Sequence, residues 1–252
     1  MFTLFSKNKK INTTQLVDEI EKAVYERVKP LGFRKHGRTL HRFVSEDISQ
    51  VINFQCGVRG LNGLFCVNIG IRVPECSERM FHSNTEKKKY YHDYECTLRC
   101  RLGEVIGKKE KWYDLKKPVS KIIKDILSQL EKKVLPAFDV LSSREQILVH
   151  RADYSWFYTF GSYQLDECMI YGHLGNIEKA KQLFEEYYQS AVDKYNDLVK
   201  NGRKQYLKKG QRVICGQQDI TANRNGYVIL YGASHRHIDY LDELAVKLGL
   251  RE

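Results

Sequence analysis

Three arginines and three side-chain amides in the first half of the chain could together bind an anion. They are Asn53, Gln55, Asn68, Arg72, Arg99 and Arg101. Guanidinium groups bind carboxylates and phosphates through paired hydrogen bonds, and amide groups donate further ones. These residue types therefore suggest binding of a phosphate, a carboxylate or an acidic protein segment, without a reaction.

Strict alternation with apolar residues predicts that β-strands carry these six side chains. The run 65–73 has Phe65, Val67, Ile69, Ile71 and Val73 on one face, and the run 48–56 alternates in the same way. The glycines between residues 57 and 63 suit a hairpin loop between the two runs. We expect a further strand at 39–44, whose facing the sequence does not fix, and another at 96–102. The result is an antiparallel sheet of about four strands.

The face that carries the six polar residues has two interpretations. Outward polar residues are the usual result of the pleat, so a solvated face is the favoured one. The alternative is a binding face for an anion or an acidic partner, formed if the strand at 96–102 joins the same sheet. This alternative is the hypothesis that we carry forward.

Two amphipathic helices should cover the apolar face of the sheet. The first spans about residues 13–28 and ends at Pro30 and Gly32. The second runs from about residue 119 to 134, where Pro136 should interrupt it. Between them we expect a long exposed loop at residues 75–94 and a buried anchoring role for Trp112.

The C-terminal part should be mainly helical. Ser142, Ser143, Arg144 and Glu145 suit a capping box for a short helix that ends at His150, and residues 166–200 indicate a helix, a turn and a second helix. Residues 203–212 are expected to form a basic connector, followed by short strands at 212–215 and 227–231 and a helix at 239–248. We therefore predict an α+β domain at residues 1–141 and a mainly helical region at 142–252.

Several ordered motifs resemble known families. The runs LGFRKHGRTLHRF, VINFQCG, FCVNIGI, CTLRCRLGE and KWYDL are similar to a bacterial family catalogued as domain of unknown function 4304. That resemblance implies a compact α+β domain and brings no activity, cofactor or catalytic residue. In the C-terminal half, MIYGHLGNIEKAKQLFEEYYQSA resembles one tetratricopeptide-like unit. A solenoid needs at least three units, so a single αα-hairpin is expected.

Composition limits the class of protein. The formal net charge is +11, and the basic residues are dispersed along the chain, so they define no single patch. The seven cysteines are scattered and odd in number, which favours free thiols and a cytoplasmic location. We find no segment suited to span a membrane and expect no membrane partner.

Searches for catalytic and metal-binding patterns are negative. Cys96 and Cys100 lack a second ligand pair for zinc, and His235 and His237 are expected to lie in a surface loop. No phosphate-binding glycine loop and no nucleophile elbow occurs. We therefore expect no cofactor and no metal.

The sequence leads to one main functional hypothesis and two alternatives. The main one is a non-enzymatic binding or adaptor module, which could be immunity-like, for an anionic or acidic partner. The first alternative is nucleic-acid binding through the basic sheet face. The second is an enzyme whose site is not visible in one sequence.

Overall fold

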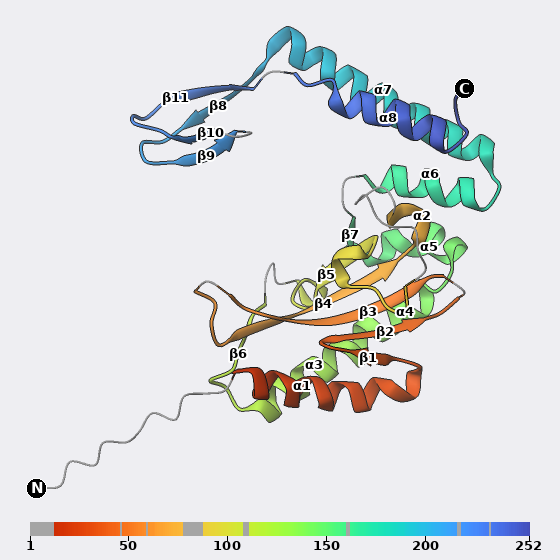
Figure 1. Cartoon of the computed structure of the whole chain (residues 1–252), viewed down its shortest axis with the longest axis vertical. Coiled ribbons are helices and arrows are strands. Elements are labelled where there is room, and N and C mark those ends of the chain that lie inside the picture. The colour runs from red at the N-terminus through yellow and green to blue at the C-terminus, as the bar shows by residue number, and fades with distance from the viewer. Residues whose placement is uncertain are drawn as a thin grey trace, which may run out of the picture. The chain divides into compact units, whose positions relative to one another are not determined.

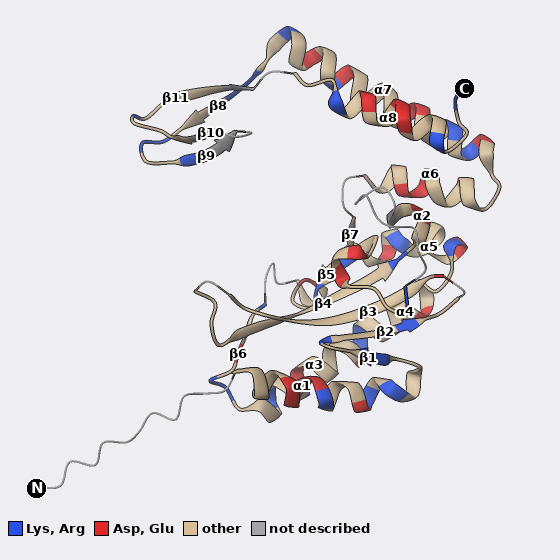
Figure 2. Cartoon of the chain, viewed as in Figure 1, with Lys and Arg blue, Asp and Glu red and all other residues tan. Residues whose placement is uncertain are grey.

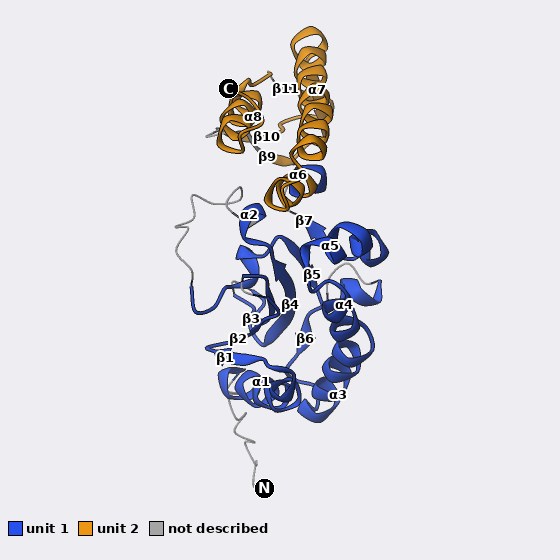
Figure 3. Cartoon of the chain, turned by 90° about the vertical axis from the view of Figure 1, so that its right-hand side faces the viewer, with its two compact units in different colours: residues 1–166 blue, residues 167–252 orange. Residues whose placement is uncertain are grey.

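The computed structural model describes residues 13–45, 47–58, 60–77, 88–107, 111–159, 162–215, 218–231 and 233–252, whose helices and strands are labelled in Figure 1. The chain divides into two compact units, residues 1–166 and 167–252, which Figure 3 colours separately. This division lies C-terminal to the predicted boundary after residue 141. The predicted basic leader at residues 1–12 lies outside the described residues.

The first unit is built on an antiparallel sheet of seven strands, so the predicted α+β class is confirmed and the sheet is larger than expected. The strand order is β1-β2-β3-β4-β5-β7, and β6 pairs with β4. The strands are β1 (Arg34–His36), β2 (Thr39–Phe43), β3 (Ser49–Cys56), β4 (Leu64–Arg72), β5 (Leu98–Arg101), β6 (Tyr113–Asp114) and β7 (Tyr158–Thr159).

Alternation in β3 and β4 produces the apolar face as predicted. Ile52 pairs with Ile69 and Phe54 with Val67, and all four side chains are almost completely buried. Directly opposed residues in an antiparallel pair point to the same side of the sheet, so these pairs form one continuous apolar surface. The helices pack on this surface.

Helices α3 and α4 lie along one side of the sheet in Figure 3. The helical elements of the first unit are α1 (Thr13–Val28), η1 (Lys29–Leu31), α2 (Pro74–Ser77), η2 (Asp93–Glu95), η3 (Glu104–Ile106), α3 (Val119–Gln129), η4 (Leu130–Val134), α4 (Leu135–Val140), α5 (Arg144–His150) and η5 (Arg151–Tyr154). Helix α1 ends at Val28, and the turn η1 that follows contains Pro30 and is capped by a left-handed Gly32 with φ +88°, as predicted. Ser143 caps α5 by accepting a hydrogen bond from the backbone of Gln146.

The prediction that Pro136 interrupts the second long helix is wrong. The helix passes through a π-helical turn, η4, and continues as α4 with Pro136 in its first turn. Proline lacks the N–H that a continuing helix would use, and the π-helical turn just before it is where the regular hydrogen-bond pattern already changes. One row of buried side chains has a four-residue spacing, at Ile122, Ile126, Leu130, Val134 and Phe138, and Leu135 and Ala137 are buried beside it. That spacing drifts by about 40° per step in an α-helix, and the wider turn offsets part of the drift.

Two polar side chains tie this helix to the sheet. Gln50 is fully buried on the helix-facing side of β3 and donates a hydrogen bond to the carbonyl of Phe138, near the end of α4. Arg42 donates to the Gln50 side chain at 2.7 Å, to the carbonyl of Leu31 at 3.1 Å and to Asp139 at 2.8 Å. These contacts satisfy carbonyl groups that a helix end leaves unpaired. They also place Arg42 and Leu40 on the helix-facing side of β2, which the sequence alone left open.

The second unit combines helices with four short strands. Its elements are α6 (Tyr163–His173), which begins in the first unit, α7 (Ile177–Asn201), β8 (Arg203–Leu207), β9 (Arg212–Cys215), β10 (Gln218–Thr221), β11 (Tyr227–Tyr231) and α8 (Arg236–Lys247). The predicted basic connector at 203–212 is therefore wrong in its first half, which is strand β8. The predicted surface loop at His235–His237 is also wrong, because His237 lies in the first turn of α8.

No helix in the described ranges is both long and apolar enough to cross a membrane.

Candidate functional site

The six residues proposed for anion binding share one face of the sheet. Asn53 lies opposite Asn68, and Asn68 lies opposite Arg101 on β5. Arg99 lies opposite Gly70, and Arg72 opposite Ser49. Opposed residues point to the same side, so the sheet brings all six side chains to the face turned away from the helices. This arrangement depends on β5 joining the sheet beside β4.

Residues 88–97, which we call the covering segment, lie over one half of this face. Tyr91 is 4% exposed, and its ring packs edge-on against Phe43. The guanidinium carbon of Arg72 lies 3.8 Å from the centre of the Tyr91 ring. Arg72 is therefore held by a cation–π contact beneath the covering segment.

Arg99 is also engaged by this covering segment. Its guanidinium group donates to the Asp93 carboxylate at 3.3 Å, and Asp93 is only 8% exposed. The prediction of an exposed loop at residues 75–94 is wrong for this part, because Tyr91 and Asp93 are buried against the sheet. Residues 78–87 of that loop lie outside the described residues.

A glycine in β4 allows the covering segment to approach closely. A Cβ atom at Gly70 would lie 2.6 Å from the sulfur of Cys96 and 2.7 Å from its Cβ. Cys96 is fully buried at this point. Any other residue at position 70 would push the segment away from the sheet, so glycine is required for the cover to close.

The other half of the face carries a chain of side-chain amides. Asn68 donates to Gln55 at 3.0 Å and lies 3.5 Å from the oxygen of Asn53. Asn53 in turn donates to the hydroxyl of Thr39 at 3.0 Å. Gln55 is exposed, whereas Asn68 is buried. The amide chain is therefore fixed from its buried end and presents Gln55 to solvent.

Arg101 lies beside this chain and packs against an aromatic ring. Its guanidinium carbon is 5.3 Å from the centre of the Trp112 ring. Trp112 is half-buried, so its predicted role as a buried anchor is wrong. Its neighbour Tyr113 has that role: it is 6% exposed, stacks on Phe65 and donates its hydroxyl to Asp125. We call Asn53, Gln55, Asn68, Arg101 and Trp112 the open half-face.

Sequence reasoning missed a cluster of histidine and tyrosine rings at the other end of the face. The ring of His36 stacks on that of Tyr90 with 3.6 Å between the ring centres, and the centre of the His41 ring lies 6.1 Å from the centre of the Tyr90 ring. His41 is 6% exposed and its buried Nδ1 atom has no hydrogen-bond partner. Burial, followed by the charges of Arg34 and His36, lowers the pKa of His41 below its usual 6.5. The alternation of His41 and Phe43 in β2 was the only signal for this cluster.

The three arginines therefore occupy three different environments. Arg72 contacts a tyrosine ring, Arg99 a carboxylate and Arg101 a tryptophan ring. These intramolecular contacts already relieve the mutual repulsion among the guanidinium groups. Repulsion therefore gives no reason for an anion to bind. The remaining candidate is the open half-face, where Gln55 is exposed next to Arg101.

The thiols on the sheet are unsuited to nucleophilic chemistry. Burial raises the pKa of Cys96 and that of Cys100 well above their usual value, so both stay protonated at neutral pH. Among the described residues, no three His, Cys, Asp or Glu side chains come together as a metal site. His235 instead contacts Asp239 at 2.6 Å, and His237 contacts the Tyr187 hydroxyl at 3.3 Å.

Comparison with known proteins gives one match. Residues 24–140 match the family model described as Domain of unknown function (DUF4304). The predicted resemblance of the N-terminal half is thereby confirmed. No curated protein and no solved structure matches the chain.

The residues that match this family model contain the whole face described above. They include the six predicted residues, the covering segment and Trp112, and they end at Val140 in α4. The second unit lies outside the matched residues. The family description gives no activity, so any role for the face has to be argued from its side chains.

Proposed function

We propose that this protein is a non-enzymatic binding module that holds a carboxylate of an acidic protein segment against the open half-face. Arg101 supplies the charge, and Gln55 supplies a further hydrogen-bond donor. Charge-assisted hydrogen bonds of this kind are stronger than neutral ones, and guanidinium suits carboxylate geometry.

One observation carries this proposal: Arg101 rests on Trp112 beside a chain of amides whose last member, Gln55, is exposed. A ring contact limits the conformations of a guanidinium group, which lowers the entropy lost when a ligand binds. Because Gln55 accepts through its oxygen, its amide nitrogen is left to solvent or to a ligand.

The two alternatives have less support. Binding of nucleic acid through this face would need several accessible cations, whereas Arg72 and Arg99 are engaged by Tyr91 and Asp93. An enzyme would need an ionisable or nucleophilic pair near a pocket, and the buried thiols of this sheet stay protonated.

The setting that we propose is the cytoplasm of a bacterium. Six cysteines of the described chain are free, and five of them are buried, which suits a reducing compartment. The αα-hairpin of α6 and α7 would act as a single tetratricopeptide-like packing unit. A protective, immunity-like role is compatible with capture of an acidic partner, and the net charge of +11 would favour the encounter.

The test uses a glutamate-rich peptide and, separately, inorganic phosphate as probes for binding by calorimetry. Arg101→Ala should weaken peptide binding by roughly ten- to a hundredfold, the usual effect of losing a charge-assisted bond. Gln55→Ala should weaken it by a smaller factor. Arg34→Ala is the matched control, because Arg34 is exposed on the neighbouring edge strand β1 and loses the same charge.

Equal losses for Arg101→Ala and Arg34→Ala would mean that net charge alone attracts the peptide, and the proposal would then fail. Phosphate binding that is also lost in Arg101→Ala would indicate a general anion site.

A further inference from the structure

The four strands of the second unit form a small basic module. Residues 203–231 contain six Lys and Arg residues and a single acidic residue, Asp219. They fold as two antiparallel pairs, β8 with β11 and β9 with β10. We call these four strands and their connections the basic module.

The basic module has its own apolar core. Leu207, Ala222 and Ile229 are buried together, and Val213, Ile220 and Tyr227 pack against them. Because these side chains fill the interior, the residues that alternate with Leu207 in β8 lie on the outer side of that strand.

One outward face places an aromatic ring between lysines. In β8, Leu207 is 1% exposed, whereas Tyr206 is 68% exposed and Lys204 is also exposed. Lys208 follows directly after the strand and is exposed as well. Tyr206 lies opposite Val228, which is 41% exposed, so the face combines one ring, one small apolar side chain and flanking cations.

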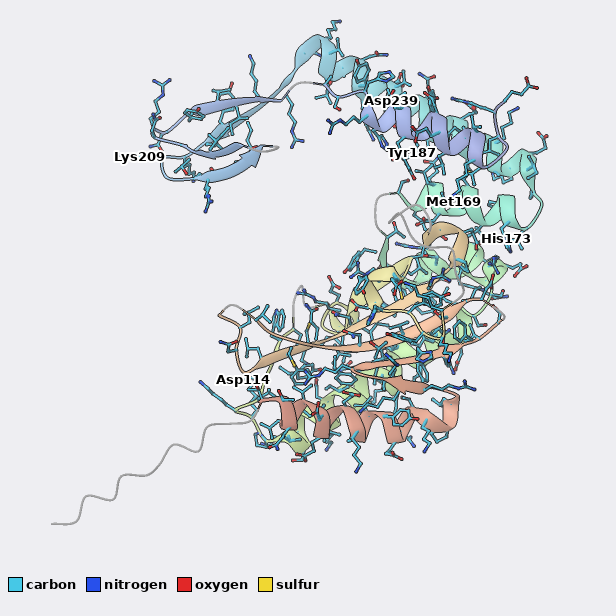
Figure 4. The ribbon with its side chains drawn as sticks, in the orientation of Figure 1. Asp114, Met169, His173, Tyr187, Lys209 and Asp239 are labelled. Atoms are coloured by element: carbon cyan, nitrogen blue, oxygen red, sulfur yellow. The ribbon has the colours of Figure 1, made fainter. Side chains whose placement is uncertain are left out.

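The tip of the basic module gathers cations from two segments. Lys209 donates its backbone N–H to the Asn225 side chain at 2.8 Å, and Gly210 donates to the carbonyl of Ala222 at 2.8 Å. These bonds hold the turn at 208–211 next to the loop that carries Arg224. Figure 4 labels Lys209 at this end, and Figure 2 shows basic residues on β8, at the tip and on β9.

The cations of this surface lack carboxylate partners. Within the part of the chain that the structure describes, Lys204, Lys208, Lys209 and Arg224 form no ion pair. A surface that places unpaired cations around an exposed ring has a strong electrostatic preference for a polyanion.

We propose that the basic module binds single-stranded nucleic acid, with Tyr206 stacking on a base and the cations contacting phosphates. Single strands are bound in this way by grooves and sheets that alternate aromatic rings with basic residues. Among the side chains of the basic module that the structure describes, the large hydrophobic ones that are exposed are Tyr206 and Val228, which is less than a membrane-binding helix presents. This site is separate from the open half-face and uses none of its residues.

The test measures binding of the full chain to fluorescent oligothymidylate and oligouridylate by anisotropy at several salt concentrations. If four phosphates are contacted, the logarithm of the affinity should fall with the logarithm of salt with a slope of about −3. Lys208→Ala with Lys209→Ala should reduce that slope by about 1.4. The matched control is Lys132→Ala with Lys133→Ala, an adjacent exposed pair on η4.

Changes at Tyr206 separate stacking from charge. Tyr206→Ala should weaken binding by about tenfold or more with the salt slope unchanged, whereas Tyr206→Phe should retain most of the affinity. Equal binding of duplex and single strands, or equal losses for the two lysine pairs, would overturn the proposal. Preferential binding to vesicles that contain anionic lipid would overturn it in favour of a membrane surface.

Discussion

Several cations of the first unit and the cations of the basic module have different surroundings. In the first unit Arg99 contacts Asp93, Arg42 contacts Asp139, and Arg144 contacts both Asp47 and Glu75. In the basic module of the second unit, four exposed cations have no carboxylate partner among the described residues. The first set stabilises the fold, whereas the second is available to a partner.

This difference shows why a net charge of +11 does not by itself locate a binding surface. Sequence patterns point to the arginines of the sheet face, because they alternate with apolar residues. The structure places Arg72 against Tyr91, Arg99 against Asp93 and Arg101 against Trp112. Only the pairing of each cation distinguishes a structural charge from one that is available to a ligand.

The largest effect should come from the most fully engaged cation. Arg144 is 9% exposed and donates to both Glu75 oxygens at 2.8 Å and to Asp47 at 2.7 and 3.1 Å. Arg144→Ala should lower the free energy of unfolding by about 2–4 kcal/mol, because both carboxylates lose their partner and are themselves partly solvated. Urea denaturation of the unchanged chain and of the variant measures this difference in the free energy of unfolding.

Arg251 in the second unit is a close control for Arg144. It also contacts two carboxylates, Glu185 and Asp242, but its side chain is 29% exposed. Arg251→Ala should therefore lower the free energy of unfolding by less than Arg144→Ala does. Equal losses of unfolding free energy would mean that burial does not strengthen the Arg144 contacts.

A smaller effect is expected where the covering segment meets the sheet. Arg99→Ala should lower the free energy of unfolding by about 1–2 kcal/mol, because Asp93 is left buried without its partner. The double variant Arg99→Ala with Asp93→Asn should lose less than the sum of the two single losses. Additive losses would mean that the 3.3 Å contact contributes no coupling.

The pH dependence of the free energy of unfolding should depend on His41, the buried histidine of β2. The pKa of His41 is lowered in the folded state, so the unfolded chain takes up a proton that the folded chain resists. The contribution of His41 is therefore complete above about pH 6.5 and is lost as the pH falls toward the folded pKa. In unfolding experiments, His41→Gln should reduce the loss of unfolding free energy as the pH falls. His36→Gln, at an exposed position, should change that loss less.

The smallest effect is predicted for the basic module. Lys208→Ala with Lys209→Ala should change the free energy of unfolding by no more than about 0.5 kcal/mol per residue, because neither side chain has a partner to lose. A clear destabilisation by this pair would show that these lysines have a structural role, and the contrast between the two units would weaken.

The sequence was sufficient for the features that depend on local periodicity. Alternation at Phe65, Val67 and Ile69 predicts β4 and its apolar face, and the spacing of Val17, Ile20 and Val24 predicts α1. Both patterns reflect side chains that leave water on one side of an element.

Features that depend on distant contacts could not be predicted in the same way. Tyr91 and Asp93 stand in a polar run, and their burial depends on Phe43, Arg72 and Arg99, which are far away along the chain. The short strands β1, β6 and β7 are too brief to show alternation. The six face residues were placed on one side by their spacing, but their partners came from segments that no local pattern identifies.

The π-helical turn gives the long helix of the first unit room for about one residue more than an α-helix needs. Glu131, Lys132 and Lys133 are exposed, so replacing any of them changes little. Removing one of them would leave an ordinary α-helical repeat, because the wider turn holds about one extra residue. Phe138 would then still face the sheet, and the Gln50 amide would keep its carbonyl partner. Removing a residue from α3 instead would rotate everything beyond it by about 100°.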